Sequence, residues 1–213
     1  HKITSRILFV WLGDGPFTPK HTQPQALPAG EGVMFAARCT ADAVTAAIDK
    51  LGVQARASVA SVNGPKTVVV AGAEAEVVAV LDELGEKGQR LGVSHAFHSP
   101  LMVPMVEEYR AVVASLSELG ALSCSPPQVP VVSTVKGDVA SAKELADPEH
   151  WVRQVWSPVL FSDALEAALG QWSGEEFNPC VVLEIGPNPV LTRMARPWVG
   201  SGRVAAWCAS LRS

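Results

Sequence analysis

Residues 93–102 read Val-Ser-His-Ala-Phe-His-Ser-Pro-Leu-Met, and they separate two halves of the chain that follow different sequence patterns. The half before them has short apolar runs and two amphipathic stretches, and the half after them alternates longer helical and strand patterns. Two imidazoles, those of His95 and His98, lie at this junction, where a substrate between the halves could reach them. A lone histidine is more often a hydrogen-bonded structural residue than a catalytic one, so both interpretations stay open from residue types alone.

The neighbours of the two histidines favour a tight strand-to-helix connection. Ser94 and Ser99 can hold the rings by hydrogen bonds, Pro100 ends the strand, and Met102 begins an amphipathic helix. Reactive side chains are often displayed on connections of this kind. The junction is therefore the first candidate for chemistry.

The half upstream of the junction predicts a small α/β unit. Strands are expected over residues 33–38, 57–62, 67–72 and 89–93, and helices over 40–51 and 73–87. Thr40 is placed to cap the first helix, and the pair Asn63-Gly64 suits a tight hairpin turn. The order β-α-β-β-α-β is that of the split βαβ, or ferredoxin-like, arrangement.

The half downstream predicts parallel α/β structure. Helices are expected over residues 101–119, 149–155, 161–172 and 190–199, and strands over 129–135, 180–186 and 204–207. At the start of the chain, residues 7–12 are compatible with a strand. The glycines and prolines that follow them, up to residue 28, forbid a long regular element, so residues 1–31 are expected to be irregular.

The composition limits the class of protein. The 213 residues are 48% hydrophobic and 18% charged, with a formal net charge of -4, which argues against nucleic acid as a partner. The four cysteines are far apart, so we expect free thiols and no metal site. No apolar run of membrane-spanning length and no targeting segment is visible, which predicts a cytoplasmic protein, or a plastid protein if the source is an alga.

Four stretches together resemble one family, the malonyl-CoA:acyl carrier protein transacylases and the acyltransferase domains of polyketide and fatty-acid synthases. They are residues 27–34 (Leu-Pro-Ala-Gly-Glu-Gly-Val-Met), 61–65 (Ser-Val-Asn-Gly-Pro), 94–102, and 183–191 (Leu-Glu-Ile-Gly-Pro-Asn-Pro-Val-Leu). The resemblance covers roughly residues 25–200 and leaves the chain unmatched up to about residue 24. It implies an irregular segment over 1–31, a ferredoxin-like small subdomain over 32–97, and the C-terminal part of an α/β-hydrolase-like large subdomain over 98–213.

The resemblance also implies roles for single residues. His98 corresponds to the catalytic base, which takes the proton of a serine hydroxyl and later that of a phosphopantetheine thiol. Gln154 corresponds to the residue whose backbone carbonyl orients that imidazole, and Asn63 to an asparagine that lines the active-site cleft. Each has a plainer alternative, because asparagine is a common turn former and Gln154 also fits as an ordinary helix residue.

Residues His95, Ala96 and Phe97 complete the substrate-binding set that the resemblance implies. With His98 they match the form of the motif that accompanies malonyl rather than methylmalonyl selection. A bulky Phe97 ring beside the acyl group would leave little room for a methyl branch. The implied substrate is malonyl-CoA, the implied partners are acyl carrier protein and neighbouring synthase domains, and no bound cofactor is expected.

The sequence departs from the family in its first residues. No G-x-S-x-G motif occurs in the 213 residues, and Pro19 stands where the family has an arginine that pairs with the malonyl carboxylate. The resemblance therefore predicts the C-terminal part of an acyltransferase domain, inactive alone, with apolar strand edges that favour association. The alternative is a noncatalytic docking or scaffold domain that binds carrier protein. A hydrolase function is less well supported, because the serine motif is missing.

Overall fold

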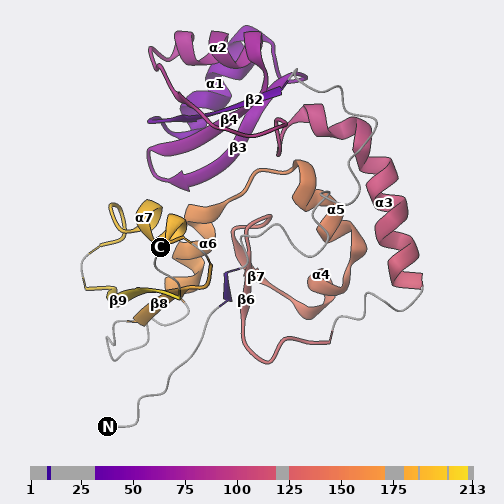
Figure 1. Ribbon diagram of the computed structural model, residues 1–213, viewed down its shortest axis with the longest axis vertical. Coiled ribbons are helices and arrows are strands. Elements are labelled where there is room, and N and C mark those ends of the chain that lie inside the picture. Colours follow the sequence, from indigo (N-terminus) through magenta and orange to yellow (C-terminus); the bar gives the residue numbers. More distant parts are fainter. Residues whose placement is uncertain are drawn as a thin grey trace.

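Four antiparallel strands form the sheet of the upstream half, in the spatial order β3-β4-β2-β5. The computed structural model describes residues 9–10, 32–118, 125–170, 180–186, 188–200 and 202–210. The elements of this half are β2 (Gly32–Ala37), α1 (Ala41–Leu51), β3 (Ala57–Gly64), β4 (Thr67–Ala73), α2 (Glu74–Glu83) and β5 (Gln89–Arg90). We call them the small lobe, and their order confirms the predicted ferredoxin-like βαββαβ arrangement (Figure 1).

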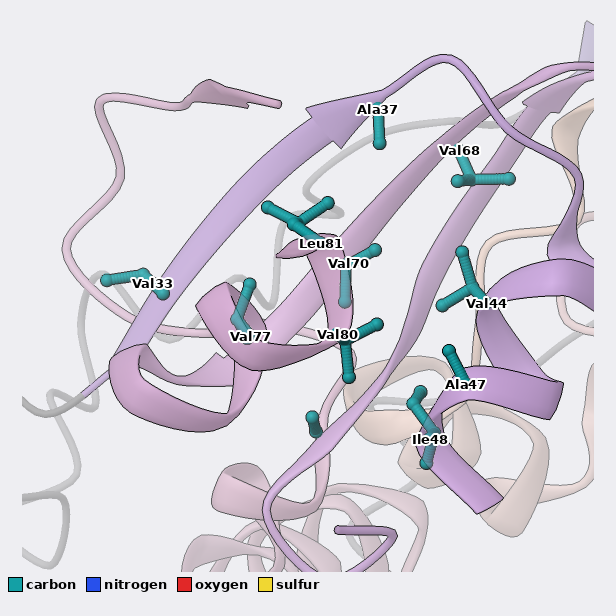
Figure 2. Packing of buried hydrophobic residues seen from close by; sticks show 11 residues of the cluster. Val33, Ala37, Val44, Ala47, Ile48, Val68, Val70, Val77, Val80 and Leu81 are labelled. Carbon is teal, nitrogen blue, oxygen red and sulfur yellow. The ribbon is translucent and has the colours of Figure 1, made fainter. Parts of the chain in front are cut away.

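The core of the small lobe lies between its sheet and its two helices (Figure 2). Alternate residues of the strands meet the apolar stripes of both helices, as the periodicity requires. The buried residues of this cluster are Val33, Ala37, Val44, Ala47, Ile48, Ala57, Val68, Val70, Val77, Val80 and Leu81. As predicted, Thr40 caps α1 by accepting a hydrogen bond from the Ala43 amide, and Gly52 ends it in the left-handed region.

The hairpin between β3 and β4 corrects one prediction. Asn63 and Gly64 belong to β3, Gly64 pairs with Thr67, and the turn itself is Pro65-Lys66. Neither Asn63 nor Gly64 has a positive φ. Glycine is needed at 64 for its small size, since a Cβ there would lie 2.8 Å from ring atoms of Trp198.

The elements after the junction, together with β1 from the start of the chain, form what we call the large lobe, and within the described residues it carries two small sheets and five helices. Its elements are β1 (Phe9–Val10), α3 (Val103–Glu118), β6 (Val131–Ser133), β7 (Asp138–Ala140), α4 (Ala142–Ala146), α5 (Pro148–Trp156), α6 (Phe161–Gly170), β8 (Cys180–Glu184), α7 (Val190–Ala195) and β9 (Val204–Ala209). β1 pairs with β6 and β8 with β9, both in parallel, whereas β7 is antiparallel to β6. The predicted α/β-hydrolase-like part is thus present as mixed α/β structure.

The junction connects the two lobes. Residues 91–101 cross the face of the small-lobe sheet that is opposite to α1 and α2, where Leu91, Phe97 and Leu101 pack against a second buried cluster. A short 3-10 helix, η1 (Pro100–Met102), then leads into α3 (Figure 1). The junction is therefore anchored on the sheet.

Some predictions concern residues outside the described part, including most of 1–31, Leu119, residues 173–179 and Pro187. Among the helices of the described residues, we find none with the length and apolar character that crossing a membrane requires.

Candidate functional site

His98 has an uncommon backbone conformation. Its φ is 57°, and it is the one non-glycine residue with a positive φ in the described part of the chain. Histidine tolerates this left-handed region better than most residues, but the conformation still costs free energy and persists where surrounding contacts fix it. Residues held in this way cluster at functional sites, and this signal is independent of the sequence motif.

Three contacts fix His98, and they come from both lobes. Its amide donates to the Val155 carbonyl at 3.3 Å, and its ring atom Nδ1 lies 2.9 Å from the Ser157 carbonyl oxygen. Its own carbonyl accepts a hydrogen bond from Ser58 Oγ at 3.1 Å. The half-buried histidine is therefore held between β3 of the small lobe and the end of α5 in the large lobe.

The contact to Ser157 is made close to Gln154, whose own role stays a prediction. The carbonyl that meets Nδ1 belongs to Ser157, three residues beyond the predicted one. Gln154 lies within α5, whereas Ser157 follows its last residue in an extended conformation (φ -76°, ψ 152°) ahead of Pro158. The helix end thus frees the Ser157 carbonyl to turn toward the imidazole.

The same contact indicates which tautomer a neutral His98 ring adopts. A carbonyl oxygen only accepts hydrogen bonds, so the proton of a neutral His98 ring must lie on Nδ1. Nε2 then carries the lone pair. This is the tautomer that a general base needs if Nε2 faces a hydroxyl or thiol.

Two of the three residues before His98, Ala96 and Phe97, pack against the small-lobe sheet. Ala96 is 2% exposed and sits directly over Gly32, where a Cβ would come within 2.8 Å of it. Phe97 is partly buried against the second cluster, and its ring centroid lies 5.9 Å from that of His95. The structure thus brings His95, Phe97 and His98 together on one short turn.

Asn63 lies toward the other end of β3. Its side-chain oxygen accepts a hydrogen bond from Ser61 at 2.5 Å, and its backbone carbonyl accepts one from Trp198 Nε1 at 3.1 Å. It lies five positions beyond Ser58 along the strand, roughly 16 Å at 3.3 Å per residue. Its place in a substrate cleft stays a prediction.

A groove of about 510 Å³ lies beside Asn63, between the start of α1, the β3–β4 turn and α6. Asp42, Asp163, Glu166 and Trp198 are among its lining residues, and His98 is not. Three carboxylates would repel a negatively charged acyl group. Asp42 and Asp163 are also first-turn residues of α1 and α6, where they stabilise the helix N-termini.

Glu184, in the stretch 183–191, has a structural role that its residue type alone does not predict. Its carboxylate accepts hydrogen bonds from the amides of Leu191 and Thr192 at 3.0 and 2.8 Å, at the start of α7. Burial alone would raise the pKa of Glu184, but these backbone hydrogen bonds outweigh it and the pKa is lowered. The motif is thus a strand, a turn and a carboxylate-capped helix.

No group of three or more histidine, cysteine, aspartate or glutamate side chains fit to hold a metal ion occurs among the described residues.

Comparison with known proteins places the chain in a family. A model of the "Acyl transferase domain" matches residues 28–207. The polyketide synthase GfsA of Streptomyces halstedii is 39% identical over 191 residues, which are 88% of this chain and 2% of that protein.

Solved structures agree with the sequence comparison. The acyltransferase domain from the second module of the salinomycin polyketide synthase has a TM-score of 0.72 and 36% identity, over 88% of this chain and 41% of that one. The complex of a type II acyl carrier protein with its malonyl-transacylase, PlMCAT:AntF, has a TM-score of 0.68 and 26% identity, over 88% and 57%. The chain thus spans about half the length of these structures and a small part of the multidomain synthase. It belongs to the acyl transferase domain family.

Proposed function

We propose that this chain is the histidine-bearing part of a malonyl-type acyltransferase domain of a polyketide or fatty-acid synthase, with His98 as the general base. The observation that carries the proposal is the hydrogen-bonded, left-handed His98, whose Nδ1 meets the Ser157 carbonyl. In the tautomer that this contact favours, Nε2 is the basic atom of the ring. Malonyl-CoA is the proposed donor. Acyl carrier protein is the proposed acceptor, since a neighbour with the same fold is a malonyl-transacylase in complex with one.

The proposed chemistry has two half-reactions that share one base. Nε2 of His98 takes the proton of a serine hydroxyl as its oxygen attacks the malonyl thioester carbonyl, and the proton then leaves with the coenzyme A thiol. Nε2 next takes the proton of the phosphopantetheine thiol, whose sulfur attacks the seryl ester and releases the serine, which regains that proton. The 213 residues hold no G-x-S-x-G motif, so in this scheme the serine comes from outside them.

A chimera would test the scheme. The N-terminal portion of an acyltransferase domain that carries a G-x-S-x-G motif is joined ahead of residue 32, and the chimera is incubated with radiolabelled malonyl-CoA and acyl carrier protein. We expect label on the serine and then on the carrier protein, and a rate about 10²- to 10⁴-fold lower for His98→Ala. Circular dichroism of both chimeras controls for folding.

The chain alone should acquire no label. A stable adduct on it would place a nucleophile within the 213 residues and contradict the scheme. Carrier-protein binding without transfer by a folded chimera would favour a noncatalytic docking domain.

Phe97 is the proposed determinant of malonyl selection, together with His95 and Ala96 beside it. In the chimera, Phe97→Ser should raise the rate with methylmalonyl-CoA relative to malonyl-CoA by roughly 10- to 200-fold, the effect of one methyl group in an apolar pocket. Competition between the two labelled thioesters measures it. An unchanged ratio would remove Phe97 from the selection.

The proposed setting is the cytoplasm, with neighbouring synthase domains on the same assembly. The three described cysteines, Cys39, Cys180 and Cys208, are free thiols, as a reducing compartment favours.

A further inference from the structure

We propose that Ser58 is a positioning residue for His98, through which the small lobe controls the aim of the imidazole. Ser58 lies near the start of β3 and is 40 residues away from His98 in sequence. Its Oγ donates to the His98 carbonyl at 3.1 Å. Of the three contacts described above, this is the one to which the partner residue contributes its side chain, so a substitution of the partner can remove it directly.

The left-handed backbone of His98 makes this contact important. In the αL region a non-glycine residue is held against a conformational cost, so loss of one contact allows the peptide plane to rotate. The Ser58 hydrogen bond lies on the carbonyl of His98, one atom beyond its Cα. Rotation there changes ψ of His98 and loosens the ring's contact with Ser157.

The turn that carries His98 is fixed separately from Ser58. Ser99 is fully buried, and its Oγ donates to the Ala96 carbonyl at 2.6 Å and accepts from the Leu101 amide. The Phe97 amide donates to the His95 carbonyl. Removing the Ser58 hydroxyl therefore should leave the turn in place and act on the His98 orientation.

The partner segment of the large lobe is joined to the same strand. The Val159 amide donates to the Ala60 carbonyl, and the Val62 amide donates to the Val159 carbonyl, both at 2.9 Å. β3 and residues 155–159 thus form one frame, with Ser58 on one side of His98 and Ser157 on the other. A shift of one lobe relative to the other would move these two partners apart and re-aim the ring.

Ring nitrogen NMR tests this on the chain as it exists. Histidine labelled with ¹⁵N reports for each ring which nitrogen carries the proton, and His98→Gln identifies the His98 signals among the five histidines. In the parent protein we expect the proton of the neutral ring on Nδ1. In Ser58→Ala the ratio of this oriented state to a freely rotating ring should fall about fivefold, the population change that a net hydrogen bond of ~1 kcal/mol supports.

Two variants act as controls. Ser61→Ala removes a different hydroxyl from the same strand. That hydroxyl donates to the Val159 carbonyl at 3.3 Å, so its loss should leave the His98 signals unchanged. Ser58→Thr keeps the hydroxyl and should retain the parent signature. An unchanged signature in folded Ser58→Ala, or an equal change in Ser61→Ala, would overturn the proposal.

Ser58→Cys covers the case in which Ser58→Ala does not fold. The cysteine thiol is larger than the hydroxyl and is a weak donor, so we expect a partial shift of the ring signals. The absence of any shift would contradict the inference. The inference depends on the proposed function only in giving the His98 ring the role of general base. Because the NMR signature needs no acyl transfer, its failure is distinguishable from failure of the labelling experiment.

Discussion

At the scale of the residue, Gly32 shows how closely the histidine motif packs on the sheet. A Cβ at this position would stand 2.8 Å from both the Cβ and the amide nitrogen of Ala96. These atoms belong to the backbone or are fixed to it, so they cannot swing aside. We expect Gly32→Ala to lower the free energy of unfolding by about 1–3 kcal/mol in urea denaturation.

Gly92→Ala is the matched control for that prediction. Position 92 lies two residues beyond β5, and a Cβ there would meet open space. The control should change stability by no more than about 0.5 kcal/mol. Equal effects of the two variants would show that contact with Ala96 does not decide the outcome.

Glu184 predicts a dependence of stability on pH. Its folded-state pKa lies below the ordinary value, so its contribution is present above the unfolded pKa and is lost as the pH falls through the folded one. Glu184→Gln should cost about 1 kcal/mol at pH 7, and this difference should shrink as the pH falls below that of an ordinary glutamate. Urea denaturation across pH 3 to 7 measures it, with Glu118→Gln at the exposed end of α3 as the control.

The residues of the site differ in how far the sequence could identify them. His95, Phe97 and His98 are consecutive or nearly so, and their motif marks them directly. The partners of His98 are 40 and 59 residues away in sequence, and their contacts depend on how two lobes meet. The role of Gln154 stays a prediction, and the Ser157 carbonyl could not be identified from the sequence because the end of α5 decides which carbonyl is free to turn.

At the scale of the element, α3 and α5 pack through an apolar cluster and an ion pair. Val152 is 0% exposed and contacts a cluster with Val106 and Val113, whereas Arg110 bonds the Glu149 carboxylate at the surface. Val152→Ala should lower the free energy of unfolding by about 2 kcal/mol through lost burial and a cavity.

Glu149→Gln provides the comparison, since it removes the charge of the ion pair on the same helix. Arg110 lowers the pKa of the Glu149 carboxyl, but both groups are solvent-exposed and screened, so we expect a cost below about 1 kcal/mol. A larger effect for Glu149→Gln than for Val152→Ala in thermal denaturation would show that charge, not packing, joins these helices.

Long elements with clear apolar periodicity were predicted to within a few residues, and short ones were not. α1, α6 and β4 follow their patterns closely. β7 and α4 went unpredicted because they have only three and five residues, too few to show an apolar period, and α4 depends on a capping box between Ser141 and Glu144.

At the scale of the whole molecule, β8 presents an apolar row to solvent. Val181 and Leu183 of β8 and Ile185, which directly follows it, are 62%, 51% and 68% exposed, and they alternate with residues that face α6 and α7. Parallel sheets are normally covered on both faces. From the sequence one can predict that successive side chains of β8 point to opposite faces of the sheet. Which face other elements cover cannot be predicted in this way, because those elements are distant in the chain.

This row predicts self-association of the chain. Its apparent mass in size-exclusion chromatography should rise with concentration, and the double variant Val181→Thr/Ile185→Thr should weaken association roughly tenfold or more, about 1.4 kcal/mol. Threonine keeps the β-branched shape that suits a strand, so the variant should fold.

The control for association removes the same kind of side chain elsewhere. Val78 on α2 and Val103 on α3 are exposed but separate from β8, so Val78→Thr/Val103→Thr should associate like the parent. If the parent stays a monomer at every concentration, the bare face of β8 does not drive association. If both double variants weaken it equally, general surface polarity and not this row is the cause, because scattered apolar residues would then act as strongly as aligned ones.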